Sequence, residues 1–460
     1  MVKKFAVLIS IALLLGLAAR GFGLNFQQAF AISIFSASIL GTLFFWDFRL
    51  SFAFLGSALL LVTRTIDVEH FIRFASLEVI LFLACMMVLV GLLKENGFFN
   101  IISHLLLGAK RLNARKFIII LSVVSAVMAS LVDEVTSIIF MIVAVLEICD
   151  RLEIDPVPFL ITSVLATNIG SSATVLGNPI GILIATKSAL TFEDFIIKAA
   201  PISALCLAVT IGVSMVWYRK ALKDFDEKIR NFNEKKIVAM EKPVVFSKDL
   251  KISLAIFGAT ILFIALHHRL EILWGLGTNT ILLAVPLLSC GAVFVWKQKN
   301  ARKHIEHDVE WWTLLFFLFL FAQAGTIQYT GATDVLAKHL MAITSGSLSI
   351  LTGAILWIAG IGSAVLDNVV LVAAIIPVVQ SFKAIGINSQ ALWWALLFGG
   401  CLGGNITLVG STANIVALGI LEKEKNIRMT FMRWFGIGLT TGVLTMIVVW
   451  AALSFIPVYR

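Results

Sequence analysis

Two groups of polar residues interrupt this otherwise apolar chain, and they resemble each other in composition and spacing. Asp133 lies 37 residues before Gly170, and Asp367 lies 36 residues before Gly403. When these two glycines are aligned, the pattern Gly-x-x-x-Thr-x-x-Gly recurs at the same spacing in both groups. Duplicated polar residues and helix breakers within apolar sequence are typical of secondary transporters built from internal repeats.

The chemistry available to such residues follows from breaking a helix inside a membrane. A break frees backbone amides and carbonyls, which are tolerated there only around an enclosed polar cavity. Freed helix N-termini attract anions and freed carbonyls bind cations, so an alkali cation, an oxyanion or a carboxylate all fit. Helix packing by small residues explains an isolated motif, but two matched copies predict a substrate or ion site. The predicted binding residues are Asp133, Glu134, Thr136, Asn168, Ser171, Ser172, Thr174, Asn178, Asp367, Asn368, Asn405, Thr407, Ser411 and Asn414.

Carboxyl groups at membrane depth are costly and mark functional sites. Asp133 and Glu134 are adjacent, so their charges repel and one of the two is expected to hold and carry a proton. The alternative is that the turn reaches water and Asp133 only caps the helix that follows, a role compatible with binding. No cofactor is predicted, and the coupling ion is a proton or sodium. Sodium would lie at Asn168, Thr174, Asn405 and Thr407.

Composition excludes an ordinary soluble globule. Hydrophobic residues make up 60% of the chain, charged residues make up 14%, and the mean hydropathy is +1.00. The net charge of +9 is typical of basic cytoplasmic loops, and no nucleic-acid motif accompanies it. The five cysteines form no CxxC pair and predict no metal site. No HExxH, Walker or GxSxG motif is present, which argues against an enzyme.

The apolar segments predict an all-α polytopic membrane protein with about 11 transmembrane helices plus two re-entrant hairpins in two inverted repeats. The hairpins cover 117–150 and 348–382, with turns at the acidic residues, and the broken crossings cover 157–186 and 391–421. Each arm of the first hairpin has about 16 residues, which is short for a crossing. The first apolar segment also resembles a signal peptide, but a transmembrane helix is favoured. The remaining spans are expected at 5–23, 27–47, 50–64, 77–93, 201–218, 251–267, 276–296, 311–329 and 434–456.

The distribution of basic residues predicts the organisation of the chain. Residues 1–218 form an N-terminal half with the first hairpin and broken helix, and residues 251–460 form a C-terminal half with the second pair. The basic stretch 219–250 between them is predicted to be a cytoplasmic linker. Counting spans from this side gives a multi-pass protein of the inner (plasma) membrane with a cytoplasmic N-terminus.

A family resemblance accompanies these motifs. The stretch Gly403-Gly-Asn405-Ile-Thr407-Leu-Val-Gly-Ser-Thr-Ala-Asn414, together with the two acidic hairpin turns, resembles the signatures of the ion transporter superfamily. The closest resemblance is to its citrate-transporter-like branch, which includes the melanocyte P protein and the arsenite-efflux permeases. The resemblance implies a scaffold domain, a mobile transport domain, an elevator motion and a homodimer. Glu134 departs from the family pattern, which usually has Asn there, and Asn178 stands where Asp is frequent.

These observations predict a secondary active transporter whose partners are the lipid bilayer and a small ion or small-molecule substrate. The favoured substrate is a small inorganic ion. Its transport would be arsenite-like oxyanion efflux or sodium/proton exchange, coupled to protons or sodium. The reason for this preference is that neither motif contains an Arg or Lys, whose fixed positive charge would strengthen the binding of a polyanion. The alternative is an organic-acid (citrate or dicarboxylate) permease coupled to sodium or protons. A passive ion channel, which shares re-entrant polar hairpins, is a further alternative.

Overall fold

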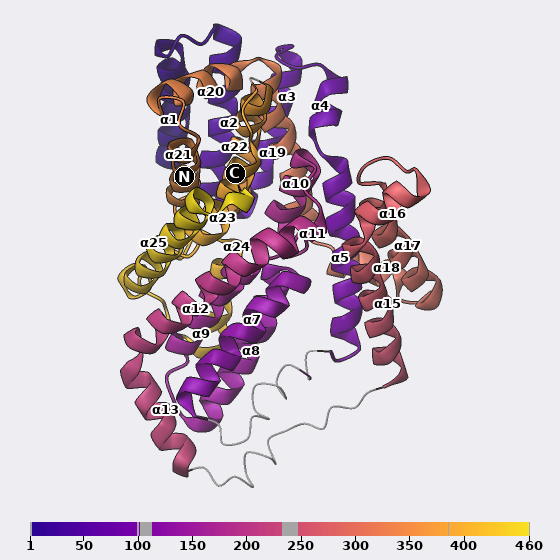
Figure 1. Cartoon of the computed structure of the whole chain (residues 1–460), viewed down its shortest axis with the longest axis vertical. Coiled ribbons are helices and arrows are strands. Elements are labelled where there is room, and N and C mark those ends of the chain that lie inside the picture. Colours follow the sequence, from indigo (N-terminus) through magenta and orange to yellow (C-terminus); the bar gives the residue numbers. More distant parts are fainter. Residues whose placement is uncertain (1, 99–100, 102–112, 232–246, 385, 460) are drawn as a thin grey trace.

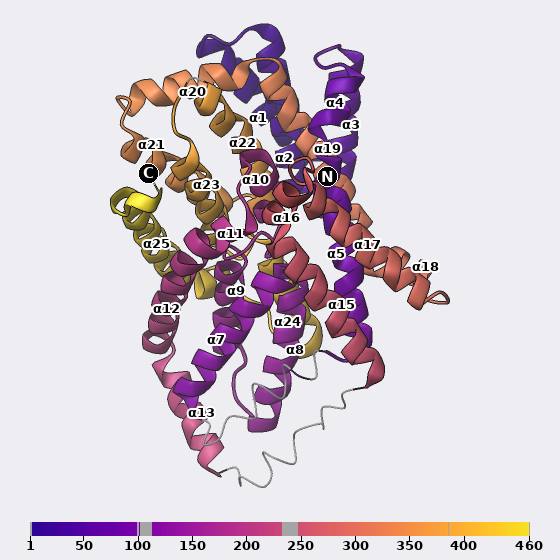
Figure 2. The same cartoon turned by 45° about the vertical axis from the view of Figure 1, so that its right-hand side comes forward.

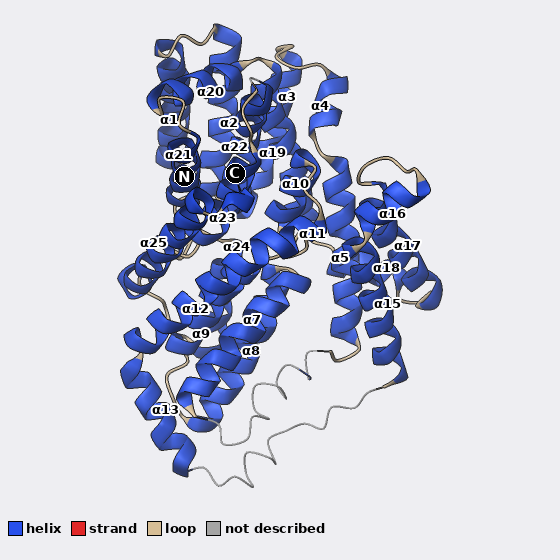
Figure 3. Ribbon diagram, in the orientation of Figure 1, coloured by secondary structure: helices blue, strands red, loops and turns tan. Residues whose placement is uncertain are grey.

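The computed structural model describes the whole chain except residues 1, 99–100, 102–112, 232–246, 385 and 460 (Figure 1). Every regular element in the described residues is a helix (Figure 3). The predicted all-α class is therefore confirmed. Figures 1 and 2 show an elongated bundle, with α13 at one end and α20 at the other.

The N-terminal half begins with paired helices that present apolar side chains outward. Helix α1 packs on α2, and the Ser33 hydroxyl donates to the Ala12 carbonyl over 2.6 Å. Leu14 and Leu17 of α1 are 62% and 67% exposed, as expected for a face in contact with lipid. The helices of this half are α1 (Val2–Gly21), α2 (Phe26–Phe44), α3 (Arg49–Val62), α4 (Val68–Phe74), α5 (Leu77–Glu95), α7 (Ala114–Leu131), α8 (Glu134–Leu152), α9 (Val157–Gly170), α10 (Pro179–Ser188), α11 (Phe192–Asp194) and α12 (Ala200–Trp217).

The C-terminal half repeats this order of long helices, hairpin and broken helix. Its first helices pack against α5, whereas its hairpin and broken helix pack against each other. The helices are α15 (Lys248–Ala265), α16 (His267–Trp274), α17 (Thr280–Trp296), α18 (Ala301–Lys303), α19 (Trp311–Tyr329), α20 (Ala332–Ile343), α21 (Leu348–Ser363), α22 (Asn368–Ala384), α23 (Gln390–Gly403), α24 (Thr412–Lys425) and α25 (Phe431–Phe455). Short 3-10 or π-helical segments cover Trp46–Phe48, Phe195–Ala199, His304–Asp308 and Pro457–Tyr459.

Both predicted hairpins are present, and they approach each other from opposite ends of the molecule (Figures 1 and 2). Helices α7 and α8 form the first, and α21 and α22 form the second. The arms α7 and α8 have 18 and 19 residues, more than the 16 or so expected. The difference arises at the base, where Asn113 caps α7 and the chain stays helical to Leu152.

The basic stretch between the two halves lies partly outside the described residues. Its first part forms helix α13 (Arg219–Asn231), and residues 232–246 are not described. Helix α13 packs on the first hairpin, where Phe225 stacks on Phe117 at 4.9 Å between ring centroids. The Asp226 carboxylate accepts a hydrogen bond from the Ala114 amide at the start of α7 over 2.7 Å. The division of the chain into two halves and a linker stays a prediction.

The length and hydropathy of a helix decide whether it can cross a membrane. Seven helices in the described residues are long and apolar enough to cross, and up to nine if two bent pairs each count as one span. The bent pairs are α15 with α16, at 66°, and α20 with α21, at 120°. The 11 expected spans included α3, α17 and the two broken helices, whose individual helices are shorter than the 18 residues of this criterion. The polytopic membrane fold itself is confirmed.

The two ends of the molecule should face opposite sides of the membrane. Lys223 on α13 and Lys338 on α20 are both exposed and lie at opposite ends (Figure 1). All five native cysteines are buried, so single cysteines at these positions report the topology. In intact cells, Lys223→Cys should react only with membrane-permeant thiol reagents, and Lys338→Cys also with impermeant ones. Labelling of Lys223→Cys by an impermeant reagent would contradict the predicted orientation.

Candidate substrate and ion site

Each broken helix packs its break against the hairpin of its own repeat. A Cβ atom on Gly170 would lie 2.2 Å from the Ala126 carbonyl oxygen, and one on Gly403 would lie 2.1 Å from the Gly360 carbonyl oxygen. Such distances are too short for any side chain, so the two backbones touch because both positions are glycine. The duplicated glycine of the sequence motif therefore marks the same helix contact in both repeats.

The duplicated threonine of the motif joins each break to its hairpin tip. The Thr174 hydroxyl donates to the Ser130 carbonyl, and the Thr407 hydroxyl donates to the Ala364 carbonyl over 2.5 Å. Each hydroxyl also accepts a bond from a backbone amide two residues later, at 3.1 and 3.3 Å. Carbonyls freed at the end of the first hairpin arm thus obtain partners, and each tip is tied to its own break.

Four helices begin at the tips and breaks, and a polar side chain caps each of them. The Asp133 carboxylate accepts bonds from two amides of α8 at 2.8 and 3.0 Å, and Asn178 caps α10 at 2.9 Å. Ser411 caps α24, and Asp367 accepts from the Val369 amide of α22 at 3.1 Å. The capping role proposed for Asp133 is present in the structure. Helix N-termini carry partial positive charge, so the helix starts offset part of the negative charge of the carboxyl groups without basic side chains.

Glu134 is the buried carboxylate at the point where the two hairpin tips meet. It is 2% exposed, and its Oε1 atom accepts bonds from the Asn368 amide at 3.2 Å and the Ser411 hydroxyl at 3.5 Å. These three residues start α8, α22 and α24. The other oxygen, Oε2, has no hydrogen-bond partner. Glu134 and Asn368, which correspond to each other in the two repeats, therefore form a direct contact between them.

Asn168 forms a second contact between the repeats. Its amide donates to the side-chain oxygens of Asn405 at 2.8 Å and Asn414 at 2.9 Å, and its own oxygen accepts from Ser411 at 3.2 Å. All four side chains are fully buried. The donors of Asn414 bind two carbonyls of the break, at 2.7 and 2.9 Å. Buried amide networks of this kind stabilise one arrangement because every group has a partner.

Not every predicted residue lies in this group. The Ser172 hydroxyl binds the Ile169 carbonyl and the Ser203 hydroxyl of α12, at 2.7 and 2.9 Å. Asn178 donates to Ser171 at 2.8 Å and to the Cys401 sulfur at 3.1 Å. The four residues proposed as sodium ligands do not form one group. Asn168 and Asn405 contact each other, whereas Thr174 and Thr407 each bind a hairpin tip.

A cavity of about 180 Å³ adjoins the tip of the first hairpin, and we call it the tip cavity. One wall comes from the starts of α8, α10, α22 and α24, and the other comes from α5 and α19 with the segment before it. Carboxyl groups line it on both walls, so it favours cations. Its polar lining is Lys94, Asp133, Glu134, Thr136, His307, Asp308, Glu310, Thr313 and Thr412.

Sequence reasoning missed the residues of the second wall. Glu310 and Thr313 lie at the start of α19, and the Thr313 hydroxyl donates to Glu310 over 3.4 Å. Arg49 is 7% exposed, donates to Thr313 over 3.2 Å and lies 4.1 Å from the Trp46 ring centroid. At the end of a predicted span, Arg49 has the pattern of a charge outside the membrane. Its burial is visible only in the tertiary structure.

A histidine beside the tip cavity was also missed. His304 is 2% exposed, and its Nδ1 atom lies 2.6 Å from Asp308, which lines the cavity. Its Nε2 atom lies 3.3 Å from Glu95. The three residues sit where a π-helical segment meets the end of α5, and such segments are frequent at functional sites. No group of three metal-ligating side chains was found in the part of the chain that the structure describes.

Comparison with known proteins agrees with this arrangement. The family model described as Citrate transporter (CitMHS) matches residues 43–399, and the chain belongs to this family. An uncharacterized transporter of Mycobacterium tuberculosis is 30% identical over 357 residues, covering 75% of this chain and 79% of that protein. Human P protein is 25% identical over 456 residues, covering 83% of this chain and 54% of the larger protein. The protein is therefore a membrane transporter, as the names of the mycobacterial relatives also indicate.

A solved structure shows the same fold. The YdaH transporter of Alcanivorax borkumensis superposes with a TM-score of 0.54 and 16% identity. The match covers 84% of this chain and 86% of that chain. The likeness extends over both halves, so the helical arrangement is a known transporter fold.

The contact between break and hairpin can be tested with a pair of glycines. Gly403→Ala places a methyl group against the Gly360 carbonyl, whereas Gly419→Ala on α24 meets nothing within 4 Å. We expect Gly403→Ala to lower stability by about 1–3 kcal/mol, because overpacking forces the helices apart. Gly419→Ala should be neutral or stabilising by up to ~1 kcal/mol. Thermal unfolding in detergent measures both, and equal melting temperatures would contradict the packing argument.

Proposed function

We propose that the protein is a secondary active transporter that moves a small inorganic ion in exchange for, or together with, protons or sodium. The observation that supports this most is Glu134, a buried carboxylate at the meeting point of both repeats with one oxygen unpartnered. Among the described residues, no Lys, Arg or His forms an ion pair with it. Glu134 lines the tip cavity, so an ion that enters this cavity meets the side chain that holds the unpartnered oxygen.

Opposing effects allow Glu134 to change its charge. The starts of α8, α22 and α24 favour the ionised carboxylate, as do its hydrogen bonds to Asn368 and Ser411. Burial beside the carboxyl groups of Asp133 and Asp367 favours the neutral acid. A group balanced in this way can take up and release a proton, or exchange the proton for sodium. We assign it the coupling role, with the Asn168 network and the two threonines as neutral ligands nearby.

The mobile unit in this proposal comprises both hairpins and both broken helices. The bonds from Thr174 and Thr407 tie each hairpin to its break, and Glu134 and Asn168 tie the two repeats together. The tip cavity lies between this unit and the wall formed by α5 and α19. An elevator motion of the unit past that wall would expose the cavity to either side. The homodimer, the cytoplasmic N-terminus and the plasma-membrane location belong to the same proposal.

An organic-acid permease is the second candidate. Two observations favour it: the matching family model is described as Citrate transporter, and Arg49 places a buried cation behind the wall of the tip cavity. A fixed guanidinium is a strong ligand for carboxylates. The first candidate requires the cavity acids to bind a cation, whereas this one requires a carboxylate to reach Arg49. Uptake of labelled citrate or succinate into proteoliposomes, compared with sodium and arsenite fluxes, separates the two.

Removing the charge of Glu134 should uncouple transport. Glu134→Gln keeps the shape of the side chain but cannot carry a proton, so proton-driven flux should fall at least tenfold and its dependence on pH should flatten. Exchange of substrate for substrate should remain, because it needs no net protonation. The control is Glu271→Gln, since Glu271 is a buried carboxylate that accepts bonds at the start of α17, outside the tip cavity. Normal proton-driven flux in Glu134→Gln between about pH 6 and 8 would refute the coupling role.

The transporter mechanism itself differs from a channel in its energetics. Proteoliposomes with an imposed proton or sodium gradient should accumulate substrate above its external concentration, because a coupled carrier converts one gradient into another. A channel only equilibrates its ion. Flux that never exceeds equilibrium under any imposed gradient would show a channel instead. The measurement is the ratio of internal to external labelled substrate over time.

A further inference from the structure

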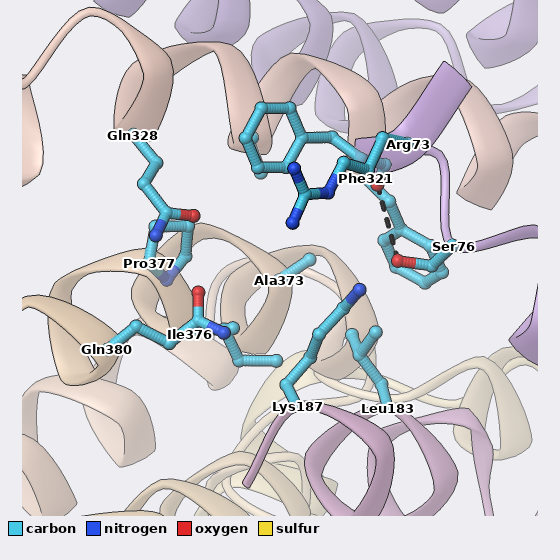
Figure 4. A pocket seen from close by; sticks show the side chains of 13 residues that line it. Arg73, Ser76, Leu183, Lys187, Phe321, Gln328, Ala373, Ile376, Pro377 and Gln380 are labelled. Atoms are coloured by element: carbon cyan, nitrogen blue, oxygen red, sulfur yellow. Dashed lines mark hydrogen bonds between the residues drawn. The ribbon is translucent and has the colours of Figure 1, made fainter. Parts of the chain in front are cut away.

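A second cavity lies on the same seam of the molecule as the tip cavity. It has a volume of about 360 Å³ and is enclosed by α4 and α19 on one side and by α10 and α22 on the other (Figure 4). Its polar lining consists of Arg73, Ser76, Lys187, Gln328 and Gln380. We call it the basic cavity, because no carboxyl group is among the described residues that line it.

The cationic groups of the basic cavity point into its space. Figure 4 shows the ends of Arg73 and Lys187 directed toward the same space. To their left lie Gln328, from the side of Arg73, and Gln380, from the side of Lys187. Lys187 has a carboxylate 3.5 Å away, Glu78 Oε1, at the limit of a hydrogen bond. Within the described residues, the Arg73 guanidinium and both glutamine amides form no hydrogen bond or ion pair. Five guanidinium donors and two amides are therefore available to a ligand.

The two cavities succeed each other along the same three helices. Each helix contributes one residue to the tip cavity and another, one turn later, to the basic cavity. Between the cavities, the rings of Phe317 and Phe321 are stacked at 6.0 Å. The pairs are Pro179 and Leu183 on α10, Phe317 and Phe321 on α19, and Val369 and Ala373 on α22. The basic cavity is thus separated from the acidic tip cavity by a layer about one turn thick.

We propose that the basic cavity is an anion-binding site that receives a carboxylate or another oxyanion of the transported solute on one side of the tip cavity. This rests on the proposed function, because it places the site on the route of a carried solute and names the solute as an anion. Arg73 binds two oxygens of the anion through its forked donors, and Lys187 supplies a second positive charge. Gln328 and Gln380 donate from the α19 and α22 sides of the cavity. A volume of about 360 Å³ accommodates a molecule as large as a tricarboxylate.

The assignment explains how a site of carboxyl groups can serve an anion. A cation or proton occupies the tip cavity, and the anion is held by fixed cations outside the polar motifs. The motifs themselves contain neither Arg nor Lys, so the fixed cations that an anionic solute needs come from the basic cavity. A phospholipid headgroup shares the oxyanion chemistry. The solute is favoured because the cavity lies on the seam that also forms the tip cavity.

The test measures anion affinity of the purified full chain in detergent, with citrate and inorganic phosphate as probes. We expect at least one of the two to bind, and we expect Arg73→Gln to weaken its binding at least tenfold and Lys187→Gln several-fold. The anion affinity of Arg73→Lys should lie between those of the unaltered chain and Arg73→Gln. Lys338→Gln, an exposed lysine of α20 outside the cavity, is the matched control and should bind as the unaltered chain does. Melting temperatures without anion should agree among all variants.

Three outcomes would overturn the proposal: neither probe binds, Arg73→Gln binds both probes as tightly as the unaltered chain, or only binding to phosphatidylglycerol vesicles falls in the variants. The last result would assign the cavity to a lipid headgroup. Glu134→Gln separates this proposal from the proposed function, because it should lose proton-driven flux but keep anion affinity. If Glu134→Gln loses proton-driven flux while Arg73→Gln keeps the anion affinity of the unaltered chain, the anion-site proposal is wrong and the proposed function stands.

Discussion

The structure depends on a carboxylate held by helix ends instead of basic side chains. Glu134 meets Asn368 and Ser411 where α8, α22 and α24 begin, and these residues come from both repeats. Partial positive charge at helix N-termini stabilises the anion without a fixed ionic partner. Such a group can lose its charge without leaving an uncompensated cation in the protein interior. Burial, hydrogen bonding and helix polarity thus together set the charge of the Glu134 carboxylate.

The inverted repeat gives these contacts their geometry. Gly170 and Gly403 bring each broken helix against its own hairpin, and equivalent threonines bind the two hairpin tips. Two hydrogen bonds between the repeats are equivalent by this symmetry. In one, Asn168 accepts from Ser411. In the other, Asn178 donates to Cys401, and these two residues occupy the positions of Ser411 and Asn168 in the opposite repeats. Corresponding residues therefore contact each other reciprocally. The symmetry is broken where it matters chemically, because one repeat supplies Glu134 and the other supplies Asn368.

The surroundings of the repeats divide the charges of the protein between two cavities. Carboxyl groups collect in the tip cavity, where α5 and the start of α19 face the hairpin tips. Basic and amide groups line the basic cavity, which begins one turn further along α10, α19 and α22 and also includes Arg73 of α4. In the proposed mechanism, this separation along one seam lets a cation bind in the tip cavity and an anion bind in the basic cavity beside it. A layer containing Phe317 and Phe321 lies between them.

The sequence by itself determined the class of fold, the two hairpin turns and the polar breaks. These are local properties: apolar length predicts helices in a membrane, and Gly, Pro and capping residues end or start them. The duplicated motif also predicted that the two breaks correspond to each other, because equal spacing between hairpin turn and break implies that each break packs on its hairpin in the same way. Accordingly, the turns at Asp133 and Asp367 and the breaks after Gly170 and Gly403 lie where the sequence placed them.

Only the tertiary structure decided which side chains from outside the motifs join the site. Arg49, Glu310 and His304 have the pattern of charges at helix ends. Only the packing of other helices buries Arg49 and His304 and places Glu310 on the wall of the tip cavity. Arg73 and Lys187 lie 114 residues apart in the sequence and share a cavity only because α4 packs on α19, α10 packs on α22, and α19 and α22 pack on each other. Spacing along one chain cannot encode such a meeting, since it depends on the packing of distant segments.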